Sequence, residues 1–191
     1  MYVVLEGVDT VGKSTQIKLL NEKFPDAIIT KEPGGTEFGA VLRNSLLNSK
    51  KLDEKTELFL FLADRSAHYE EIIKPNLNSL VISDRSFISG IAYALSLKQF
   101  SFEWLIELNK FALENTLPDK VILFEITKDE LTSRLGNKSQ DRIEKRGIDY
   151  MIDVQEQMKS VSKKLNIELL LVDATQSIDE IHSKIYSFLN S

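Results

Sequence analysis

The sequence contains no cysteine and only two histidines, His68 and His182, among its 191 residues. Without cysteine there is no disulfide bond and no thiolate metal site, and two histidines are too few for a histidine-rich metal centre. The fold must therefore be stabilised by packing alone.

Long hydrophobic segments are also missing. No apolar run reaches the roughly 18 residues that a membrane-spanning helix needs. The amino-terminal segment MYVVLEG lacks a basic region followed by a long apolar stretch and a cleavage site, so it does not resemble a signal peptide. These absences lead us to expect a cytoplasmic protein that does not bind membranes.

There is no excess of basic side chains either. The 24 lysine and arginine residues stand against 29 aspartate and glutamate residues, which gives a net charge of −5. A chain with this balance has no electrostatic surface for wrapping a nucleic acid or for docking on an anionic membrane. Any polyanion that it binds must be small and must be bound locally.

What the sequence does contain is a set of short apolar runs. The chain has the length of one domain and is long enough to bury roughly 70% of its unfolded surface. Four runs are nearly continuous, at residues 2–6, 80–83, 120–126 and 168–173, and a shorter one lies at 26–30. Continuous apolar strands are typical of a parallel sheet that is covered on both faces.

Helical patterns lie between these runs, at residues 13–24, 37–48, 54–73, 86–97, 102–114, 129–135, 148–165 and 178–189. Because strands and helices alternate, we expect an α/β domain with right-handed crossovers. The helix predicted over 54–73 is apolar around most of its circumference in its first half. This pattern indicates a helix buried on two sides, either in the core of the monomer or against a second subunit.

The stretch RLGNKSQDRIEKRG, residues 134–147, has a different character. It is polar and strongly charged and has no apolar period. A solvated connection would explain this composition. Long loops in compact α/β domains are, however, often lids over a site, and arginines suit a lid that closes over phosphates. We therefore predict a lid at about residues 135–147.

Residues 6–15, EGVDTVGKST, have the spacing of a phosphate-binding loop between a predicted strand and a predicted helix. Glycines allow backbone N–H groups to turn toward a phosphate, and the start of the helix adds the positive end of its dipole. In this pattern Lys13 reaches the β and γ phosphates and Ser14 ligates magnesium. The predicted nucleotide cradle consists of Gly7, Val8, Asp9, Thr10, Val11, Gly12, Lys13, Ser14 and Thr15.

The loop alone is compatible with GTPases, motor ATPases and kinases. A GTPase would carry Asn-Lys-x-Asp to bind guanine, but the nearest match, residues 109–112, ends in alanine within a helical pattern. A motor would present an acidic pair after a second apolar strand, where this chain has Asp84 and Arg85. A kinase that acts on a phosphate acceptor fits better, because it needs no catalytic base, only cations that bring two polyanions together.

Four further segments resemble the thymidylate kinase family. They are TKEPGGTEFGAVLRNSLL at 30–47, LFLADRSAH at 60–68, DRSFISGIAYA at 84–94 and VDATQSIDEI at 172–181. The resemblance implies a P-loop nucleoside-monophosphate-kinase fold: one domain over the whole chain, with a five-stranded parallel sheet, helices on both faces and a lid. It also implies that a homodimer transfers the γ-phosphoryl group of Mg-ATP to thymidine monophosphate (dTMP), giving the diphosphate in dTTP synthesis.

For the acceptor phosphate, the resemblance assigns a clamp to Arg43 and Arg85, whose planar guanidinium groups suit bidentate contact. Asp9 would connect the loop to the acceptor nucleotide on the side of its 3′-hydroxyl. Asp84 would position Arg85 or bind magnesium together with Ser14, although an Asp-Arg pair after a strand can also be a plain salt bridge. The predicted catalytic residues are Lys13, Asp9, Arg85 and Arg142.

For the acceptor nucleoside, the resemblance assigns contacts to Phe61, Arg65, Ser89 and Tyr93. Phe61 would stack on the thymine ring, and Arg65, one helical turn later, would reach the base edge. Ser89 would face the base, and Tyr93 would lie under the sugar and exclude a 2′-hydroxyl. Core packing is the alternative for both aromatic residues.

Thr10 occupies a position where one subgroup of the family carries an arginine that touches the γ phosphate. Members without that arginine supply the charge from the lid, so the resemblance implies a catalytic arginine at Arg142, with Arg134 and Arg146 as alternatives. An arginine in this role is worth ~10^3 to 10^5 in rate. Arg134 would otherwise stack on adenine, and Ala174, in the turn after the last strand, would lie beside the purine.

The sequence also departs from the family pattern. Ser86 replaces the usual tyrosine after Asp-Arg, Gly90 stands where some members carry a side chain that bonds to the base, and Glu125 stands where aspartate is common. A kinase for another (deoxy)nucleoside monophosphate is therefore the alternative function. A kinase for a free nucleoside would need a carboxylate base, and a nucleotide sensor without turnover would not need the intact Lys13, Ser14 and lid arginines.

Overall fold

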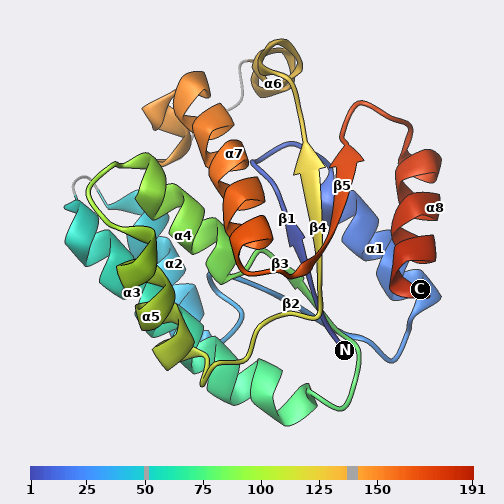
Figure 1. Cartoon of the computed structure of the whole chain (residues 1–191), viewed down its shortest axis with the longest axis horizontal. Helices are drawn as coiled ribbons and strands as arrows, with labels where there is room; N and C mark the ends of the chain where they lie inside the picture. The colour runs from blue at the N-terminus through green and yellow to red at the C-terminus, as the bar shows by residue number, and fades with distance from the viewer. Residues whose placement is uncertain (50–51, 137–141) are drawn as a thin grey trace.

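The computed structural model describes residues 1–49, 52–136 and 142–191, and one parallel sheet lies at its centre (Figure 1). The strands are ordered β2-β3-β1-β4-β5, and every neighbouring pair is parallel. The strands are β1 Tyr2–Glu6, β2 Ile28–Lys31, β3 Val81–Asp84, β4 Lys120–Glu125 and β5 Glu168–Asp173. The predicted five-stranded parallel sheet is confirmed, with small shifts at the strand ends.

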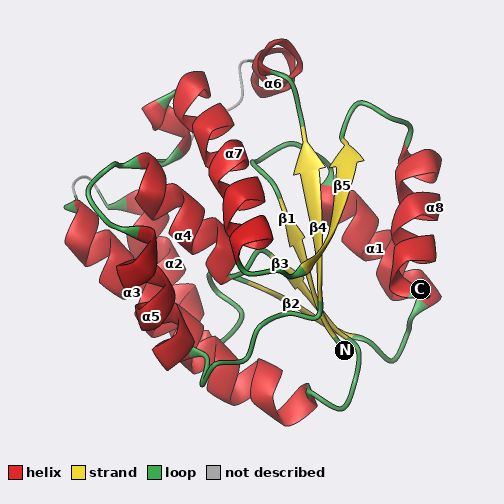
Figure 2. Cartoon of the chain, in the orientation of Figure 1, coloured by secondary structure: helices red, strands yellow, loops and turns green. Residues whose placement is uncertain are grey.

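Helices cover both faces of the sheet, as predicted (Figure 2). Helices α3, α4, α5 and α7 pack on one face, α1 and α8 pack on the other, and α2 lies against α3. Their bounds are α1 Lys13–Lys23, α2 Glu37–Asn48, α3 Glu54–His68, α4 Phe87–Ser96, α5 Phe102–Ala112, α6 Lys128–Leu135, α7 Ile148–Lys164 and α8 Ile178–Leu189.

Strand β1 shows why the apolar runs are continuous in the sequence. Tyr2 and Val4 belong to the hydrophobic cluster on the side of α3, α4, α5 and α7. Val3 and Leu5 belong to the cluster on the side of α1 and α8. All four side chains are buried. Because alternate residues of a strand point to opposite faces and both faces are covered, every position must be apolar.

The largest difference from the predicted elements lies at α3. The sequence predicts one helix over 54–73, but α3 ends at His68 and continues as a wider π-helical turn, Tyr69–Ile73, and a 3₁₀ turn, Lys74–Asn76. Pro75 lacks the N–H that a regular helix needs, so the α-helical hydrogen bonds cannot run through it. Within the monomer α3 packs against α2 and against α4 and α5, while Phe59 in its first half is 58% exposed.

The carboxyl ends of three strands bring three connecting segments together. Leu5 of β1 and Lys31 of β2 both pair with Asp84 of β3. The loop after β1, the segment after β2 and Arg85 after β3 therefore leave the sheet at the same edge. This is the edge at which parallel α/β sheets bind their ligands.

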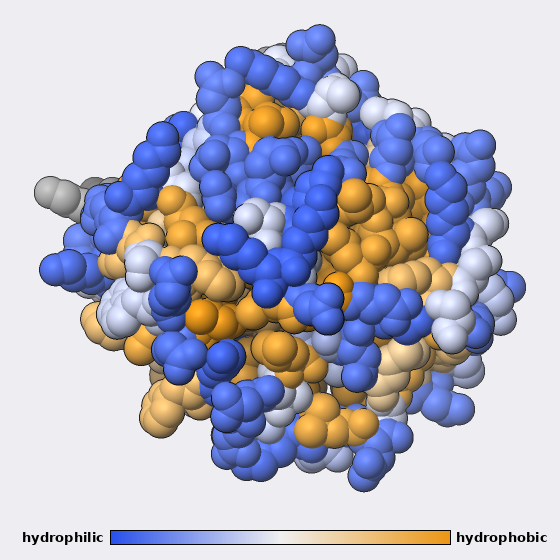
Figure 3. Space-filling model, in the orientation of Figure 1, coloured by the Kyte–Doolittle hydropathy of each residue, from blue (hydrophilic) through white to orange (hydrophobic). Residues whose placement is uncertain are grey.

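The surface mixes polar and apolar groups. On the face shown in Figure 3, apolar side chains lie in patches between ridges of hydrophilic ones. Four large apolar side chains on α2, α3 and α5 are mostly exposed, namely Phe38, Val41, Phe59 and Phe111. Among the described residues, no helix has both the length and the apolar character that crossing a membrane requires.

Candidate active site

A pocket of about 360 Å³ opens at the carboxyl edge of the sheet. Its lining includes ten of the predicted site residues, Asp9, Thr10, Val11, Gly12, Lys13, Ser14, Thr15, Arg43, Asp84 and Arg85. Lys31 and Glu32, which carried no predicted site role, complete the lining. The fold therefore brings the phosphate loop, the end of β3 and an arginine of α2 around one space.

The backbone of the phosphate loop requires glycine at both ends. Gly7 has φ +142°, and a Cβ atom at this position would lie 3.0 Å from the carbonyl oxygen of Phe124. Gly12 has φ +97° and immediately precedes α1. Only glycine adopts such angles without strain. The first residues of α1, Lys13, Ser14 and Thr15, line the pocket, which is the position that an anion-binding helix start requires.

Lys13 folds back over the loop. Its Nζ donates hydrogen bonds to the carbonyl oxygens of Gly7 at 2.8 Å and of Val8 at 2.9 Å. Burial, reinforced by the positive charge of Arg85, lowers the pKa of Lys13 to about 8. The ammonium group is therefore still mostly protonated at neutral pH, and it is poorly solvated. A phosphate in the pocket would offer it better partners than two carbonyl groups.

Arg85 is held by contacts from several elements. Its φ of +71° lies in the left-handed region, which is rare for a residue with a side chain and is common at functional sites. Nη2 donates to Asp9 Oδ1 at 2.9 Å, and Nη1 donates to Ser89 Oγ at 3.2 Å. The guanidinium also lies over the ring of Tyr93, with Cζ 5.8 Å from the ring centroid.

The charge of Arg85 is secured by its surroundings. Burial works against the charged form, but Tyr93, Asp9 and Asp84 outweigh it and raise the pKa of Arg85. Arg43 lines the same pocket, where its Nη1 donates to the carbonyl oxygen of Pro33 at 2.8 Å. Two guanidinium groups therefore face one space, as the predicted phosphate clamp requires.

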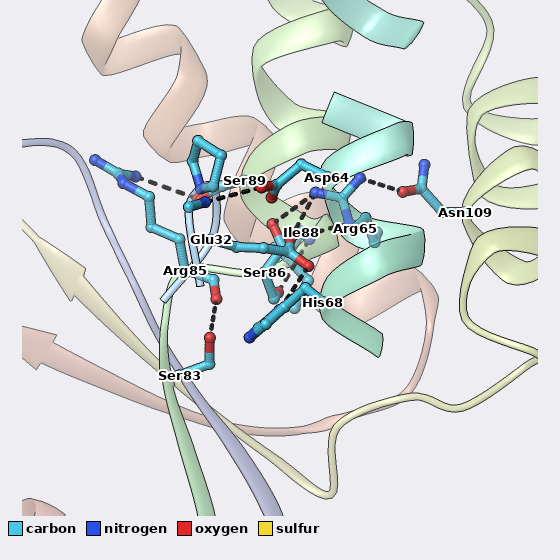
Figure 4. A network of polar contacts seen from close by, with 12 residues as sticks. Glu32, Asp64, Arg65, His68, Ser83, Arg85, Ser86, Ile88, Ser89 and Asn109 are labelled. Atoms are coloured by element: carbon cyan, nitrogen blue, oxygen red, sulfur yellow. Dashed lines mark hydrogen bonds and ion pairs between the residues drawn. The ribbon is translucent and has the colours of Figure 1, made fainter. Parts of the chain in front are cut away.

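Arg65 lies in a buried polar network (Figure 4). Its Nε and Nη2 donate to Glu32 Oε2 at 3.0 and 2.8 Å, and its Nη1 donates to Asn109 Oδ1 at 2.6 Å. His68 Nδ1 lies 3.3 Å from the other oxygen of Glu32. A Cβ atom on Gly90 would lie 2.8 Å from Arg65 Nη2, so any larger residue at this position would force Arg65 to move. The side chain predicted to reach the base edge is therefore rigidly held.

The two predicted aromatic contacts lie beside this network. Phe61 and Tyr93 line a small hollow together with Gly90. Both also pack in the hydrophobic cluster on the side of α3, α4, α5 and α7. Tyr93 is 7% exposed, and its ring lies 6.2 Å from the ring of Tyr150. Core packing, the alternative given for these residues, thus accounts for much of their contact surface.

Sequence reasoning missed Glu6, the last residue of β1. This fully buried carboxylate accepts hydrogen bonds from the hydroxyl groups of Ser86, at 2.6 Å, and of Ser89. Burial raises the pKa of Glu6, and the two serine hydroxyls partly oppose this effect. The available signal was an acidic residue that closes an apolar strand just before the loop. Asn109 gave no signal, because nothing local marks it as a partner of Arg65.

The flanks of the predicted lid make specific contacts, while its residues 137–141 lie outside the described residues. Arg142 Nη2 and Arg146 Nη2 donate to the same oxygen of Glu57, at 2.5 and 2.8 Å. Arg142 Nε also donates to the carbonyl oxygen of Leu46. Neither arginine lines the pocket around the phosphate loop.

Arg134 and Ala174 occupy the other end of the site. Nη1 of Arg134 donates to the carbonyl oxygen of Thr10 at 3.3 Å, and its Nη2 donates to that of Ala174 at 2.8 Å. Arg134 thereby joins the phosphate loop to the turn after β5. The contact of these two residues with a purine stays a prediction.

The donor set near the loop fits magnesium. Asp84 Oδ1 is buried and has no hydrogen-bond partner in the described part of the chain, and Ser14 is exposed in the same pocket. In residues 1–49, 52–136 and 142–191, no group of three His, Cys, Asp or Glu residues could hold a metal alone. Mg²⁺ commonly takes one or two protein oxygens and completes its shell with phosphate oxygens and water.

Comparisons with known proteins agree on one family. A family model described as thymidylate kinase matches residues 5–185. The thymidylate kinase of Aliarcobacter butzleri is 54% identical over 190 residues, which cover 100% of this chain and 99% of that protein. The thymidylate kinase of Sulfurimonas denitrificans is 50% identical over 190 residues, which cover 100% of this chain and 100% of that protein. The crystal structure of thymidylate kinase from Ehrlichia chaffeensis is similar with a TM-score of 0.77 at 27% identity, over 100% of this chain and 98% of that one.

Proposed function

The chain belongs to the thymidylate kinase family, whose reaction transfers the γ-phosphoryl group of ATP to dTMP, and we propose how its residues divide that work. The observation that carries the proposal is the single pocket shared by the phosphate loop, Arg43 and Arg85. Backbone N–H groups and Lys13 suit a triphosphate, and the two guanidinium groups suit a second anion. Reaction between two polyanions depends on such positioning and charge compensation.

On the donor side, residues 7–15 would cradle the phosphates of ATP. Lys13 would exchange its two carbonyl partners for β- and γ-phosphate oxygens, which compensate its charge better. Arg134 and Ala174 would lie at the adenine, and the hydrogen bonds that tie Arg134 to this turn and to the loop support the assignment.

On the acceptor side, Arg43 and Arg85 would clamp the phosphate of dTMP. Asp9, which pairs with Arg85, would hold the clamp at the loop and face the sugar. The base and sugar would contact Phe61, Arg65 and Tyr93. The rigid network around Arg65 supports a role in recognition, because a fixed donor discriminates between bases better than a mobile one.

Magnesium would be held by Ser14 and Asp84 together with phosphate oxygens. When bound, Mg²⁺ neutralises charge that develops on the phosphoryl group. Oδ1 of Asp84, which has no hydrogen-bond partner among the described residues, supports this assignment. Asp84 would also keep Arg85 charged.

Arg142 would supply the positive charge that Thr10 lacks. In the present geometry Arg142 bonds to Glu57 and to Leu46, so the proposal requires it to leave these partners during the reaction. Arg134 and Arg146 are the alternative sources of the charge.

A free nucleoside as acceptor is disfavoured by the state of Glu32. This carboxylate lines the pocket and would be the candidate base for a hydroxyl group. Burial alone would raise the pKa of Glu32, but Arg65 and His68 lower it below its ordinary value. A base with a lowered pKa is weak, and its oxygens are already occupied by Arg65 and His68.

Two further assignments concern the whole protein. We propose that it is a homodimer, because exposed apolar side chains such as Phe59 of α3 and Val41 of α2 lie on adjacent helices. We also propose that it is cytoplasmic, where its nucleotide substrates and reduced conditions suit a chain without cysteine.

A panel of acceptors tests the substrate. Purified protein with Mg-ATP should phosphorylate dTMP far faster than uridine, cytidine or guanosine monophosphate, and thymidine should not react. Equal rates across the monophosphates would refute the choice of dTMP. Turnover of thymidine would show that a hydroxyl acceptor reacts and would contradict the argument from Glu32.

A further inference from the structure

Glu6 is fully buried at the base of the phosphate loop, where three donors converge on its carboxylate. Ser86 Oγ, at 2.6 Å, and Ser89 N, at 3.4 Å, donate to Oε1, and Ser89 Oγ donates to Oε2. All three partners lie at the junction of β3 and α4. An ionised carboxylate is an acceptor only, so this arrangement matches its needs. Because burying a carboxylate is costly, its place in an apolar strand calls for a function.

The hydrogen bonds of Ser89 have a fixed direction. Its hydroxyl carries one proton, and that proton is donated to Glu6. The oxygen is then left as an acceptor, and Arg85 Nη1 donates to it at 3.2 Å. The result is a one-way chain of hydrogen bonds from the Arg85 guanidinium through the Ser89 hydroxyl to the Glu6 carboxylate.

Arg85 is thereby held at two points. Nη1 is fixed through Ser89, and Nη2 is fixed by Asp9 at 2.9 Å. The backbone is fixed as well, because Ser83 Oγ donates to the carbonyl oxygen of Arg85 at 2.7 Å. A planar fork that is anchored at both terminal nitrogens has a defined plane, and that plane decides how it meets a phosphate.

Ser86 provides a contrast within the same cluster. Its hydroxyl donates to Glu6 and accepts from the N–H of Ile88, so it caps the first turn of α4. The side chain of Ser86 thus shares Glu6 with Ser89 but belongs to the helix cap rather than to the chain that reaches Arg85.

We propose that Glu6 is a positioning residue for the acceptor phosphate, which acts through the Ser89 hydroxyl to set the plane of Arg85. The proposal rests on the proposed role of Arg85 in the phosphate clamp. It also gives Ser89 a role other than the predicted contact with the base, because its hydroxyl is already engaged on both sides.

Calorimetric binding of two ligands to the full-length protein tests this role. The ligands are dTMP and thymidine, which differ only in the phosphate. Glu6→Met keeps the unbranched shape of the side chain and removes both acceptor oxygens. We expect the Kd for dTMP to rise about 10- to 100-fold and the Kd for thymidine to stay unchanged, because only the phosphate meets Arg85. Equal weakening of both ligands, or of neither, would overturn the proposal.

A double-mutant cycle tests the path through Ser89. Ser89→Ala should weaken dTMP binding as Glu6→Met does, and the double variant should bind no worse than Ser89→Ala alone. Additive losses would show that Glu6 acts independently of Ser89 and would overturn the proposal. If Glu6→Met does not fold, Glu6→Gln replaces it in the same cycle with the same ligand pair.

Ser86→Ala is the matched control, because it removes a bond to Glu6 without breaking the chain to Arg85. It should lower the melting temperature and leave the ratio of the dTMP and thymidine affinities unchanged. A change in this ratio as large as that of Glu6→Met would refute the path through Ser89.

Arg85→Ala separates this proposal from the proposed function. If Arg85→Ala binds dTMP as tightly as the wild type, the clamp and the positioning role both fail. If Arg85→Ala weakens dTMP binding and neither Glu6→Met nor Ser89→Ala does, the clamp stands and the role of Glu6 is overturned.

Discussion

Arg85 Nη2 lies 2.9 Å from Asp9 Oδ1, although the two residues are 76 positions apart in the sequence. This ion pair joins the phosphate loop to the segment after β3. The same guanidinium reaches Ser89 through its other terminal nitrogen. The groups assigned to the two substrates are thus parts of one connected structure, and this connection can be tested.

Arg85→Lys should raise the KM for dTMP about 10- to 100-fold and change the KM for ATP little. Lysine keeps the charge, but its single nitrogen cannot serve Asp9, Ser89 and a phosphate in one plane. Steady-state kinetics with each substrate varied in turn measures the effect. A change confined to the KM for ATP would contradict the assignment of Arg85 to the acceptor.

Lys13→Met should lower kcat about 10^2- to 10^3-fold, since the ammonium group would stabilise charge on the transferring phosphoryl group. Circular dichroism should show an unchanged fold. Lys18→Met, on an exposed position of the same helix, is the control and should behave as the wild type does. If both variants retain full kcat, Lys13 has no catalytic role.

Arg142→Ala should lower kcat more than it raises either KM. Arg146→Ala is the matched control, because both arginines bond to the same oxygen of Glu57 and each variant loses one such bond. If both variants lose similar stability but only Arg142→Ala loses kcat, Arg142 is the catalytic arginine. The reverse result, a loss of kcat in Arg146→Ala only, would assign the role to Arg146.

Glu32→Gln should lower the free energy of unfolding at neutral pH by about 3–5 kcal/mol, because the buried guanidinium of Arg65 would lose its counter-charge. Urea unfolding measures this difference. Glu70→Gln, which weakens an exposed ion pair with Lys74, should cost about 0–1 kcal/mol and serves as the control.

The effect of Glu32 should also depend on pH in a defined direction. Burial alone would raise the pKa of Glu32, but Arg65 and His68 lower it below its ordinary value of 4.5. The folded state then binds fewer protons than the unfolded chain, so this stability is present above pH 4.5 and is lost as the pH falls through the folded pKa. The difference in the free energy of unfolding between the wild type and Glu32→Gln should therefore become smaller in acid. A gap that stays constant with pH would contradict this.

Phe59→Glu should convert the proposed dimer into a monomer at micromolar concentration. Phe59 is 58% exposed on α3, and a carboxylate at an apolar interface would be buried without a partner. Ile178→Glu is the control, because Ile178 is 54% exposed on α8, on the far side of the sheet from α3. Gel filtration distinguishes the outcomes, and a wild type that elutes as a monomer would refute the dimer.

Much of the fold could be predicted from the sequence because its signals are local. The apolar runs identify the strands, and the glycines of the phosphate loop report backbone angles that only glycine adopts easily. The end of α3 at His68 was missed, because a proline marks where a helix must stop but not how far before it the hydrogen-bond pattern changes.

The sequence could predict which residues line the pocket, but not which other side chains form hydrogen bonds with the predicted site residues. Ten predicted residues do line one pocket, since the strand ends that carry them meet at one edge of the sheet. The sequence could not show that Asn109 and Glu32 hold Arg65, or that Glu57 holds Arg142. These partners come from elements that are distant in the chain, and only packing decides which side chains meet.

Residues 6–15, EGVDTVGKST, show what the sequence determines by itself and what only the tertiary structure determines. By itself the sequence predicts that this segment binds phosphate, because spacing, strand and helix start are properties of neighbouring residues. The tertiary structure alone decided what Glu6 and Asp9 contact, by placing Ser89 and Arg85 of a different strand-helix junction beside them. The physical reason is that a hydrogen bond depends on distance and direction in space, which the order of residues does not record.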